Sequence, residues 1–120
     1  MPGFKPIDTA KLRGTVSALT DRLAQGDYEG LCRVARTSRL GPEEVERVVR
    51  HYGRHLVTPP VAAFDAIDLV PISSSDPQRW SAIVPLWSNE EGPSDLSLEL
   101  TLEDSPAPVY AVEIEDLHVL

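Results

Sequence analysis

Residues 80–120 read WSAIVPLWSNEEGPSDLSLELTLEDSPAPVYAVEIEDLHVL. In the middle of this stretch, from Asp95 to Glu103, every second residue is leucine and the residues between are polar. Successive side chains of a strand point to opposite faces, so this alternation predicts a β-strand with one face in the core and one in water. Residues 109–119 also alternate between apolar and mostly polar side chains, and residues 79–87 carry apolar side chains on both faces. We therefore expect a sheet that the upstream chain covers.

The upstream half shows three helical patterns. Residues 9–25 repeat leucine and valine on one helical face, with Asp8 or Thr9 as the cap and Gly26 as the end. A short helix that begins after Asp27 faces inward, and Gly41-Pro42 opens a third helix with a regular apolar stripe up to residue 52.

Four strands are predicted, over residues 64–72, 79–87, 95–103 and 109–119. Their connections are too short for a crossover helix, so sequence neighbours should pair antiparallel. The expected class is α+β: three N-terminal helices packed on one face of a curved four-stranded antiparallel meander sheet, with a cone-like form. The chain is expected to be a single domain, with a loose arm at 1–8, a helical part at 9–53 and a β-sheet part at 62–120.

Two positions interrupt the regular strand patterns. The apolar register of the last strand changes between Ile114 and Leu117, so an extra residue near Glu115-Asp116 predicts a β-bulge or a sharp bend. The alternative is a strand end that is buried on both sides. Pro85 has no N–H for a sheet ladder, so it should lie at an edge or at a bulge.

The charge is distributed unevenly along the chain. Residues 1–60 hold ten Lys/Arg and seven Asp/Glu, whereas residues 61–120 hold one Arg and twelve Asp/Glu. An acidic sheet argues against nucleic acid as a partner, because phosphate binding needs Lys and Arg. Solubility and protection of the sheet edges account for most of these acids. No signal peptide or apolar run of membrane-spanning length is present, so we expect a cytoplasmic protein with no membrane partner.

Two stretches, WSAIVPLWSNEEGPSDLSLELTLED and YAVEIEDLHVL, together resemble a family of small bacterial proteins of unknown function. Its members share a tryptophan-strand-tryptophan, an acidic-glycine loop and a terminal acidic-leucine-histidine-valine. The segment ALTDRLAQGDYEGL is similar to the opening of nuclear-transport-factor-like, polyketide-cyclase-like and cystatin-like cone domains. The first resemblance implies no chemistry, and the second implies a pocket between helices and sheet.

The nearest approach to a chemical site is the group Glu113, Glu115, Asp116 and His118. Carboxylates and imidazole can bind a divalent metal or exchange protons, and the two glutamates share one strand face. Alternation alone explains acids on a wet face, however, and there is no second cluster with ligand spacing. We therefore expect no metal, no cofactor and no catalytic residue.

The acidic loop at residues 89–95 is a second candidate for cation binding. Its carboxylates would suit weak calcium binding, but it lacks the ligand period of a calcium-binding hand. Gly92-Pro93 is sufficient reason for a turn.

Trp80 and Trp87 are seven residues apart, so on a regular strand they face opposite sides. Only one can lie in the core of a one-sided sheet. The other either belongs to an interface or is covered by a loop or by the N-terminal arm.

Two functions remain open. The first hypothesis is a non-enzymatic interaction domain that binds a protein partner, or a second copy as a homodimer, through an acidic sheet face. The alternative is a cone-type pocket for a small molecule, in a carrier or an enzyme, with Tyr28, Tyr52, Trp80 or His118 at its mouth between the helices and the sheet. The candidate binding residues for the two hypotheses together are Trp80, Trp87, Tyr28, Tyr52, Glu113, Asp116 and His118.

Overall fold

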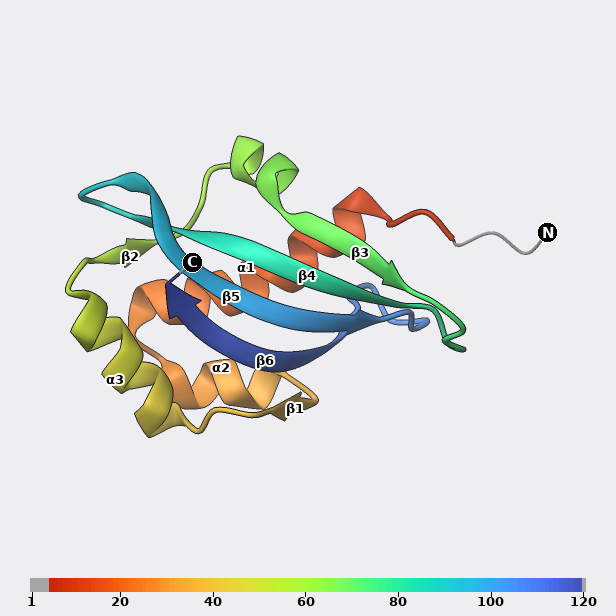
Figure 1. The fold of residues 1–120 in the computed structure, drawn as a ribbon, viewed down its shortest axis with the longest axis horizontal. Helices are drawn as coiled ribbons and strands as arrows, with labels where there is room; N and C mark the ends of the chain where they lie inside the picture. Colours follow the sequence, from red (N-terminus) through yellow and green to blue (C-terminus); the bar gives the residue numbers. More distant parts are fainter. Residues whose placement is uncertain (1–4, 120) are drawn as a thin grey trace.

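The computed structural model describes residues 5–119. Helices come first in the chain, and the longer strands follow (Figure 1). The elements are α1 (Thr9–Gln25), α2 (Tyr28–Val34), β1 (Thr37–Ser38), α3 (Pro42–Tyr52), β2 (Leu56–Val57), the 3₁₀ helix η1 (Val61–Ala66), β3 (Asp68–Ile72), β4 (Arg79–Ser88), β5 (Gly92–Glu103) and β6 (Ala111–Val119). The strands form one curled sheet, and α1 lies behind it in the view of Figure 1.

The α+β class is confirmed, but the predicted sheet is wrong in its strand number and direction. The strand order is β1-β6-β5-β4-β2, with β3 also paired to β4. β3 to β6 are antiparallel neighbours, as a meander requires. β1 is parallel to β6, so the sheet is mixed and six-stranded. β1 and β2 were missed because two residues are too few to show an alternating pattern.

The first predicted strand is also corrected. Residues 61–66 form η1, and β3 begins only at Asp68. The N–H of Ala63 donates to the carbonyl of Pro60 at 2.9 Å, which starts the 3₁₀ turn. Apart from Asp65 this segment is apolar, and periodicity cannot distinguish a short apolar strand from a helical turn.

The helix ends follow the local chemistry that the sequence indicates. The carboxylate of Asp8 caps α1 by accepting from the N–H of Lys11 at 3.2 Å. Gly26 ends α1 in the left-handed region, at φ 71°, where a side chain would be strained. Asp27 caps α2 directly afterwards, by accepting from the N–H of Gly30 at 2.9 Å. α1 and α2 are therefore joined almost without a linker.

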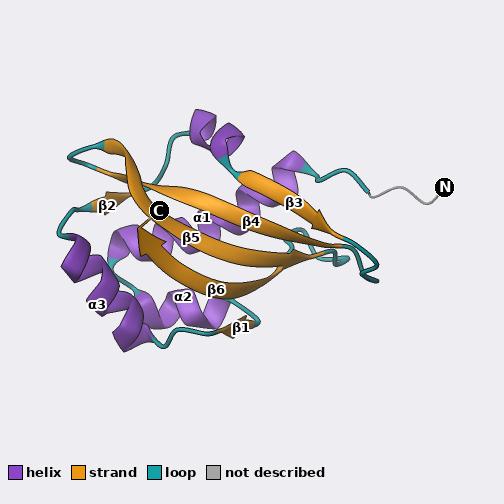
Figure 2. Ribbon diagram, viewed as in Figure 1, coloured by secondary structure: helices purple, strands orange, loops and turns teal. Residues whose placement is uncertain are grey.

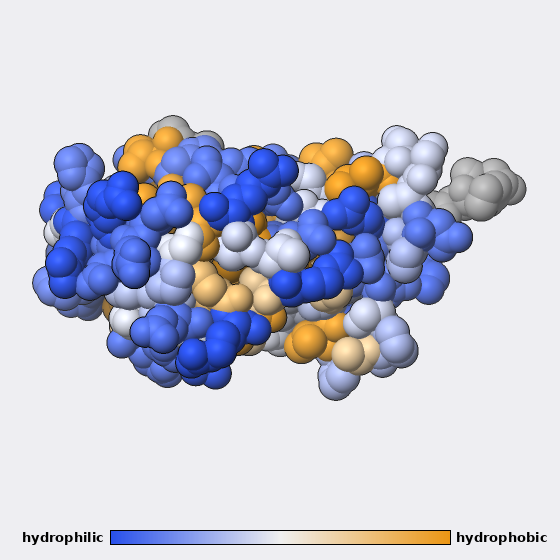
Figure 3. Space-filling model, turned by 90° about the horizontal axis from the view of Figure 1, so that it is seen from below, coloured by the Kyte–Doolittle hydropathy of each residue, from blue (hydrophilic) through white to orange (hydrophobic). Residues whose placement is uncertain are grey.

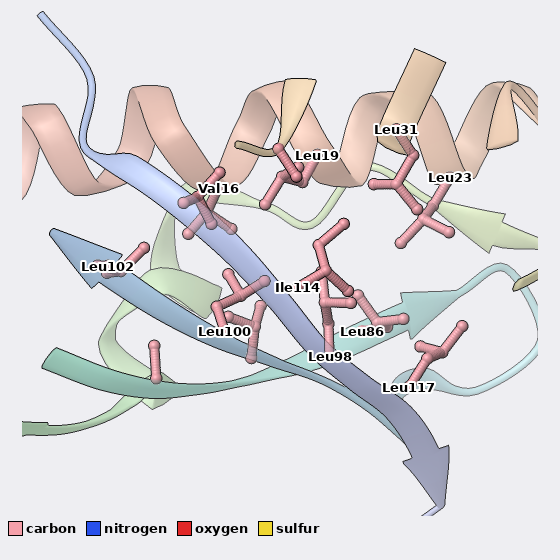
Figure 4. Packing of buried hydrophobic residues seen from close by; sticks show 14 of the residues in the cluster. Val16, Leu19, Leu23, Leu31, Leu86, Leu98, Leu100, Leu102, Ile114 and Leu117 are labelled. Carbon is pink, nitrogen blue, oxygen red and sulfur yellow. The ribbon is translucent and has the colours of Figure 1, made fainter. Parts of the chain in front are cut away.

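The core lies between α1 and the inner face of the sheet (Figure 4). Leu19 of α1 is 0% exposed and Leu98 of β5 is 1% exposed. α2 and α3 complete the cover with Leu31 and Val45, both buried. The apolar side chains labelled in Figure 4 are Val16, Leu19, Leu23, Leu31, Leu86, Leu98, Leu100, Leu102, Ile114 and Leu117.

Trp80 is the tryptophan in the core. It is 3% exposed, and its ring meets that of Tyr110 edge-on at a centroid distance of 5.3 Å. The Tyr110 hydroxyl accepts from the N–H of Asp8 at 2.9 Å, and burial raises the pKa of this tyrosine. Of the arm predicted at 1–8, residues 1–4 lie outside the described residues, and Lys5 pairs with Asp104 at 2.8 Å.

Both predicted irregularities are present. Glu99 pairs with Asp116 and Leu100 pairs with Ile114, so Glu115 is the extra residue of a β-bulge. The bulge returns Leu117 to the core, where it is 2% exposed. The β4–β5 register shifts just after Pro85, as its missing N–H predicts.

Leu19→Ala tests the contact between α1 and the sheet. The substitution leaves a cavity at the fully buried centre of the core, so we expect a loss of about 2–5 kcal/mol in the free energy of unfolding. Urea denaturation measures it. Arg13→Ala, at an exposed position of the same helix, should change stability by no more than about 0.5 kcal/mol. Equal effects of the two substitutions would contradict this description of the core.

Candidate functional site on the outer sheet face

The outer face of the sheet is the face turned away from α1. Among the described residues no helix crosses in front of β4, β5 and β6, as Figure 2 shows. Because side chains alternate, this face carries the residues that lie between the core side chains, and all of them except Ser97, which is 2% exposed, are at least partly exposed. They are Arg79, Ser81, Ile83, Pro85 and Trp87 of β4, Ser97, Glu99, Thr101 and Glu103 of β5, and Glu113, Glu115, Asp116 and His118 of β6.

Arginines neutralise one end of the outer face. The guanidinium of Arg36 contacts Glu103 at 2.8 Å and Glu113 at 2.7 Å. Arg79 reaches Glu113 from β4 at 3.1 Å. The hydrogen bond from Arg36 lowers the pKa of Glu103. Two acids thus face two arginines, and Glu113, a candidate from the sequence, is held by both of them.

Glu115 is separated from Glu113 by a different partner. Its carboxylate lies 2.7 Å from the Nε atom of Arg39 and accepts from the Thr101 hydroxyl at 2.9 Å. The sequence pattern put Glu113 and Glu115 on one face and within reach of one ion. In the structure each is bound to arginine instead, so the two glutamates do not converge on a common cation.

A second group of titratable side chains lies farther along the same face. We call Glu99, Asp116 and His118 the histidine cluster. The Nε2 atom of His118 is hydrogen-bonded to the carboxylate of Glu99 and lies 3.9 Å from the Oδ2 atom of Asp116. One donor atom from each residue lies within 4.8 Å of the other two. The hydrogen bond to Glu99 raises the pKa of His118 above its ordinary value.

The histidine cluster keeps an uncompensated negative charge. Within residues 5–119, Glu99 and Asp116 have no lysine or arginine at ion-pair distance, and only His118 faces them. Sequence reasoning named Asp116 and His118 but missed Glu99, because it lies on a different strand. The available signal was the bulge, since one extra residue in β6 brings Asp116 opposite Glu99.

Trp87 is half-buried on the outer face. Its cross-strand neighbours are Val57 of β2 and Pro93 of β5. A Cβ atom on Gly92 would lie 3.5 Å from the indole ring, so the ring rests close to the turn of the hairpin. Trp87 is therefore covered in part by its own hairpin and open in part to solvent.

The acidic loop of the hairpin has internal partners. Glu90 accepts from the N–H of His55 at 2.9 Å and lies 2.6 Å from the Nδ1 atom of the same residue. Glu91 accepts from the Tyr52 hydroxyl at 2.8 Å and from the Ser88 hydroxyl at 2.9 Å. These contacts join the hairpin to the end of α3. The side chains of Glu90, Glu91 and Tyr52 therefore stabilise the fold at this point.

The residues named for a cone-type pocket lie in separate places. Trp80 is in the core and His118 is on the outer face. Tyr28 lines an open, polar hollow of about 770 Å³ beside α3, and Tyr52 lines a mainly apolar groove of about 420 Å³ with Leu96. Figure 3, viewed from below, shows hydrophobic atoms in several patches among hydrophilic ones. The four residues do not surround one cavity.

Fold and site together define a small α+β domain with a curled mixed sheet and one uncovered sheet face. The chain belongs to the family described as a domain of unknown function (DUF7668), whose model matches residues 20–120. No curated protein and no solved structure matches the chain. In the described part of the chain, no helix has the length and apolar character to cross a membrane. The resemblance to a family of unknown function holds, while its shared motifs and the cone-domain likeness stay predictions.

The contact between Glu90 of the β4–β5 hairpin and His55 should make part of the free energy of unfolding depend on pH. The N–H of His55, and then its imidazole, lower the pKa of Glu90 from 4.5 to about 2. Since the folded-state pKa is the lower one, this contribution is complete above the unfolded-state pKa and is lost as the pH falls toward 2. We expect Glu90→Gln to be less stable than wild type near neutrality and to approach it in strong acid, as measured by urea denaturation.

Asp65→Asn is the matched control, because Asp65 is an exposed carboxylate of η1. It should follow the wild-type pH dependence throughout. A constant stability difference between Glu90→Gln and wild type at every pH would contradict the role of this carboxylate.

Proposed function

We propose that the chain is a cytoplasmic, non-enzymatic interaction domain that binds a basic protein partner through the outer face of its sheet. The observation that carries this proposal is the combination of an uncovered sheet face with an unneutralised acidic group on it. Among residues 5–119, Glu103, Glu113 and Glu115 have arginine partners, whereas Glu99 and Asp116 do not. A basic side chain of a partner would therefore be drawn to the histidine cluster.

An apolar row adjoins the histidine cluster and supports the same proposal. Ile83 lies opposite Glu99, and Pro85 lies opposite Ser97, which is the cross-strand neighbour of His118. Val70 of β3, 56% exposed, lies opposite Ser81, and the exposed carboxylate of Asp68 lies opposite Ile83. Apolar side chains beside unpaired charges are typical of a protein interface, in which burial supplies affinity and charge selects the partner.

The charge also argues for a different protein rather than a second copy. Two copies that met symmetrically at the histidine cluster would bring four carboxylates together, and like charges across an interface cost several kcal/mol. A partner that presents Lys or Arg beside an apolar surface avoids this cost. Its association should weaken with added salt, because exposed charges are screened over about 8 Å at physiological ionic strength.

Site-specific photo-crosslinking in the native host tests the proposal. A benzoylphenylalanine at position 81, exposed on the outer face, should give a cross-linked species whose second component is a basic protein. The same residue at position 13, exposed on α1, should not give that species. Glu99→Gln combined with Asp116→Asn should reduce its yield at least tenfold.

Glu43→Gln combined with Asp65→Asn is the charge-matched control, because it removes the same charge from α3 and η1. This control should leave the yield unchanged. A species of twice the mass of the chain would favour a homodimer over the proposed partner. An acidic partner, or equal cross-linking from positions 13 and 81, would contradict the proposal.

A further inference from the structure

The histidine cluster has the donor set of a transition-metal site. It offers one imidazole nitrogen and two carboxylate oxygens, all within 4.8 Å of one another. A tetrahedral zinc ion, bound at about 2.0–2.2 Å, holds its ligand atoms roughly 3.3 Å apart. The side chains of His118, Glu99 and Asp116 are 33%, 35% and 50% exposed, so they have room for the small rotations that this spacing requires.

The backbone positions the three side chains in advance. The bulge at Glu115 puts Asp116 directly opposite Glu99, and His118 lies one pair farther along the same face. The N–H of Leu117 donates to the Oδ1 atom of Asp116 at 2.9 Å, while Oδ2 is the atom near His118. One oxygen of this carboxylate is thus held by the backbone while the other remains available as a ligand.

The imidazole of His118 is also oriented toward the centre of the cluster. The Nδ1 atom of His118 lies 3.4 Å from the carbonyl oxygen of Val119, and Nε2 points to the carboxylates. An N–H on Nδ1 directed at a backbone carbonyl is the usual outer contact of a metal-binding histidine. A metal ion at Nε2 would replace the proton that this atom now shares with Glu99.

The local charge distinguishes this cluster from the neighbouring acids. Glu113, the candidate that the sequence suggested, is occupied by Arg36 and Arg79. Glu99 and Asp116 have no such partner within residues 5–119. With a neutral imidazole their two carboxylates need two positive charges, which is the charge of one divalent cation.

We propose that Glu99, Asp116 and His118 bind a divalent transition-metal ion of the zinc type, with a coordination position left for water or for a ligand from a partner. Imidazole together with carboxylate suits Zn²⁺ and Co²⁺, whereas Mg²⁺ and Ca²⁺ prefer oxygen ligands alone. This inference goes beyond the proposed function, because metal binding is a property of the isolated chain and requires no protein partner.

Isothermal titration calorimetry of the purified, tag-free chain with zinc chloride tests the site. We expect a single equivalent of zinc to bind, with a higher melting temperature in its presence. Magnesium chloride should produce neither effect. Cobalt chloride should bind at the same site and give a visible absorption band. His118→Gln and Glu99→Gln should each weaken zinc binding roughly tenfold or more and remove the thermal shift.

Matched controls come from other histidines and acids of the chain. His55→Gln removes a second histidine that lies beside a carboxylate, at 2.6 Å from Glu90, and should bind zinc as wild type does. Glu113→Gln should also bind zinc normally. Circular dichroism and urea denaturation of His118→Gln establish that the variant is folded before its affinity is compared.

Three results would overturn the proposal. They are zinc binding by His118→Gln equal to that of wild type, loss of binding in His55→Gln, or equal binding of magnesium and zinc. Failure of the photo-crosslinking experiment would leave these measurements unaffected, since they contain no partner. The proposed function and the metal site can therefore fail independently.

Discussion

Burial of the leucine row on β5 is the interaction on which the rest of the structure depends. Leu96, Leu98, Leu100 and Leu102 are each 1% exposed or less. Burying a leucine side chain stabilises the fold by about 1.5–3 kcal/mol, so this row is a large part of what binds α1 to the sheet. β5 pairs with β4 on one side and β6 on the other, and its alternation extends across both neighbours. The same alternation turns the polar residues outward, so the core and the open acidic face have a single cause.

The β-bulge in β6 connects this packing to the candidate site. Without the bulge, regular alternation after Ile114 would turn Asp116 toward the core and Leu117 toward solvent. Arginines from the helical half of the chain reduce the negative charge of the outer face, since Arg36 pairs with Glu103 and Arg39 pairs with Glu115. Exposed ion pairs contribute at most about 1 kcal/mol each. Their main effect here is to leave Glu99 of β5 and Asp116 of β6 without an arginine partner among the described residues.

The two proposals depend on the same two carboxylates and therefore affect each other. A divalent cation bound at Glu99 and Asp116 would cancel the charge that attracts a basic partner. Metal and basic side chain are then competitors for one cluster. A partner that supplies the remaining metal ligand would instead be joined to the sheet by the ion. In each case Ile83 and Pro85 lie across β5 from the cluster and give the contact its apolar part.

The sequence by itself determined what depends on neighbours along the chain. The alternation of leucine and polar residues identified β5, and the change of register in β6 located the bulge beside Asp116. The apolar face of α1 and the glycine at position 26 predicted where this helix ends. Only the tertiary structure decided what depends on residues far apart in the chain. It added β1 and β2, which are too short to carry a period, and it put Trp80 rather than Trp87 in the core. It also brought Glu99 to His118 and two arginines to Glu113, because strand pairing, and not sequence spacing, decides which side chains meet across a sheet.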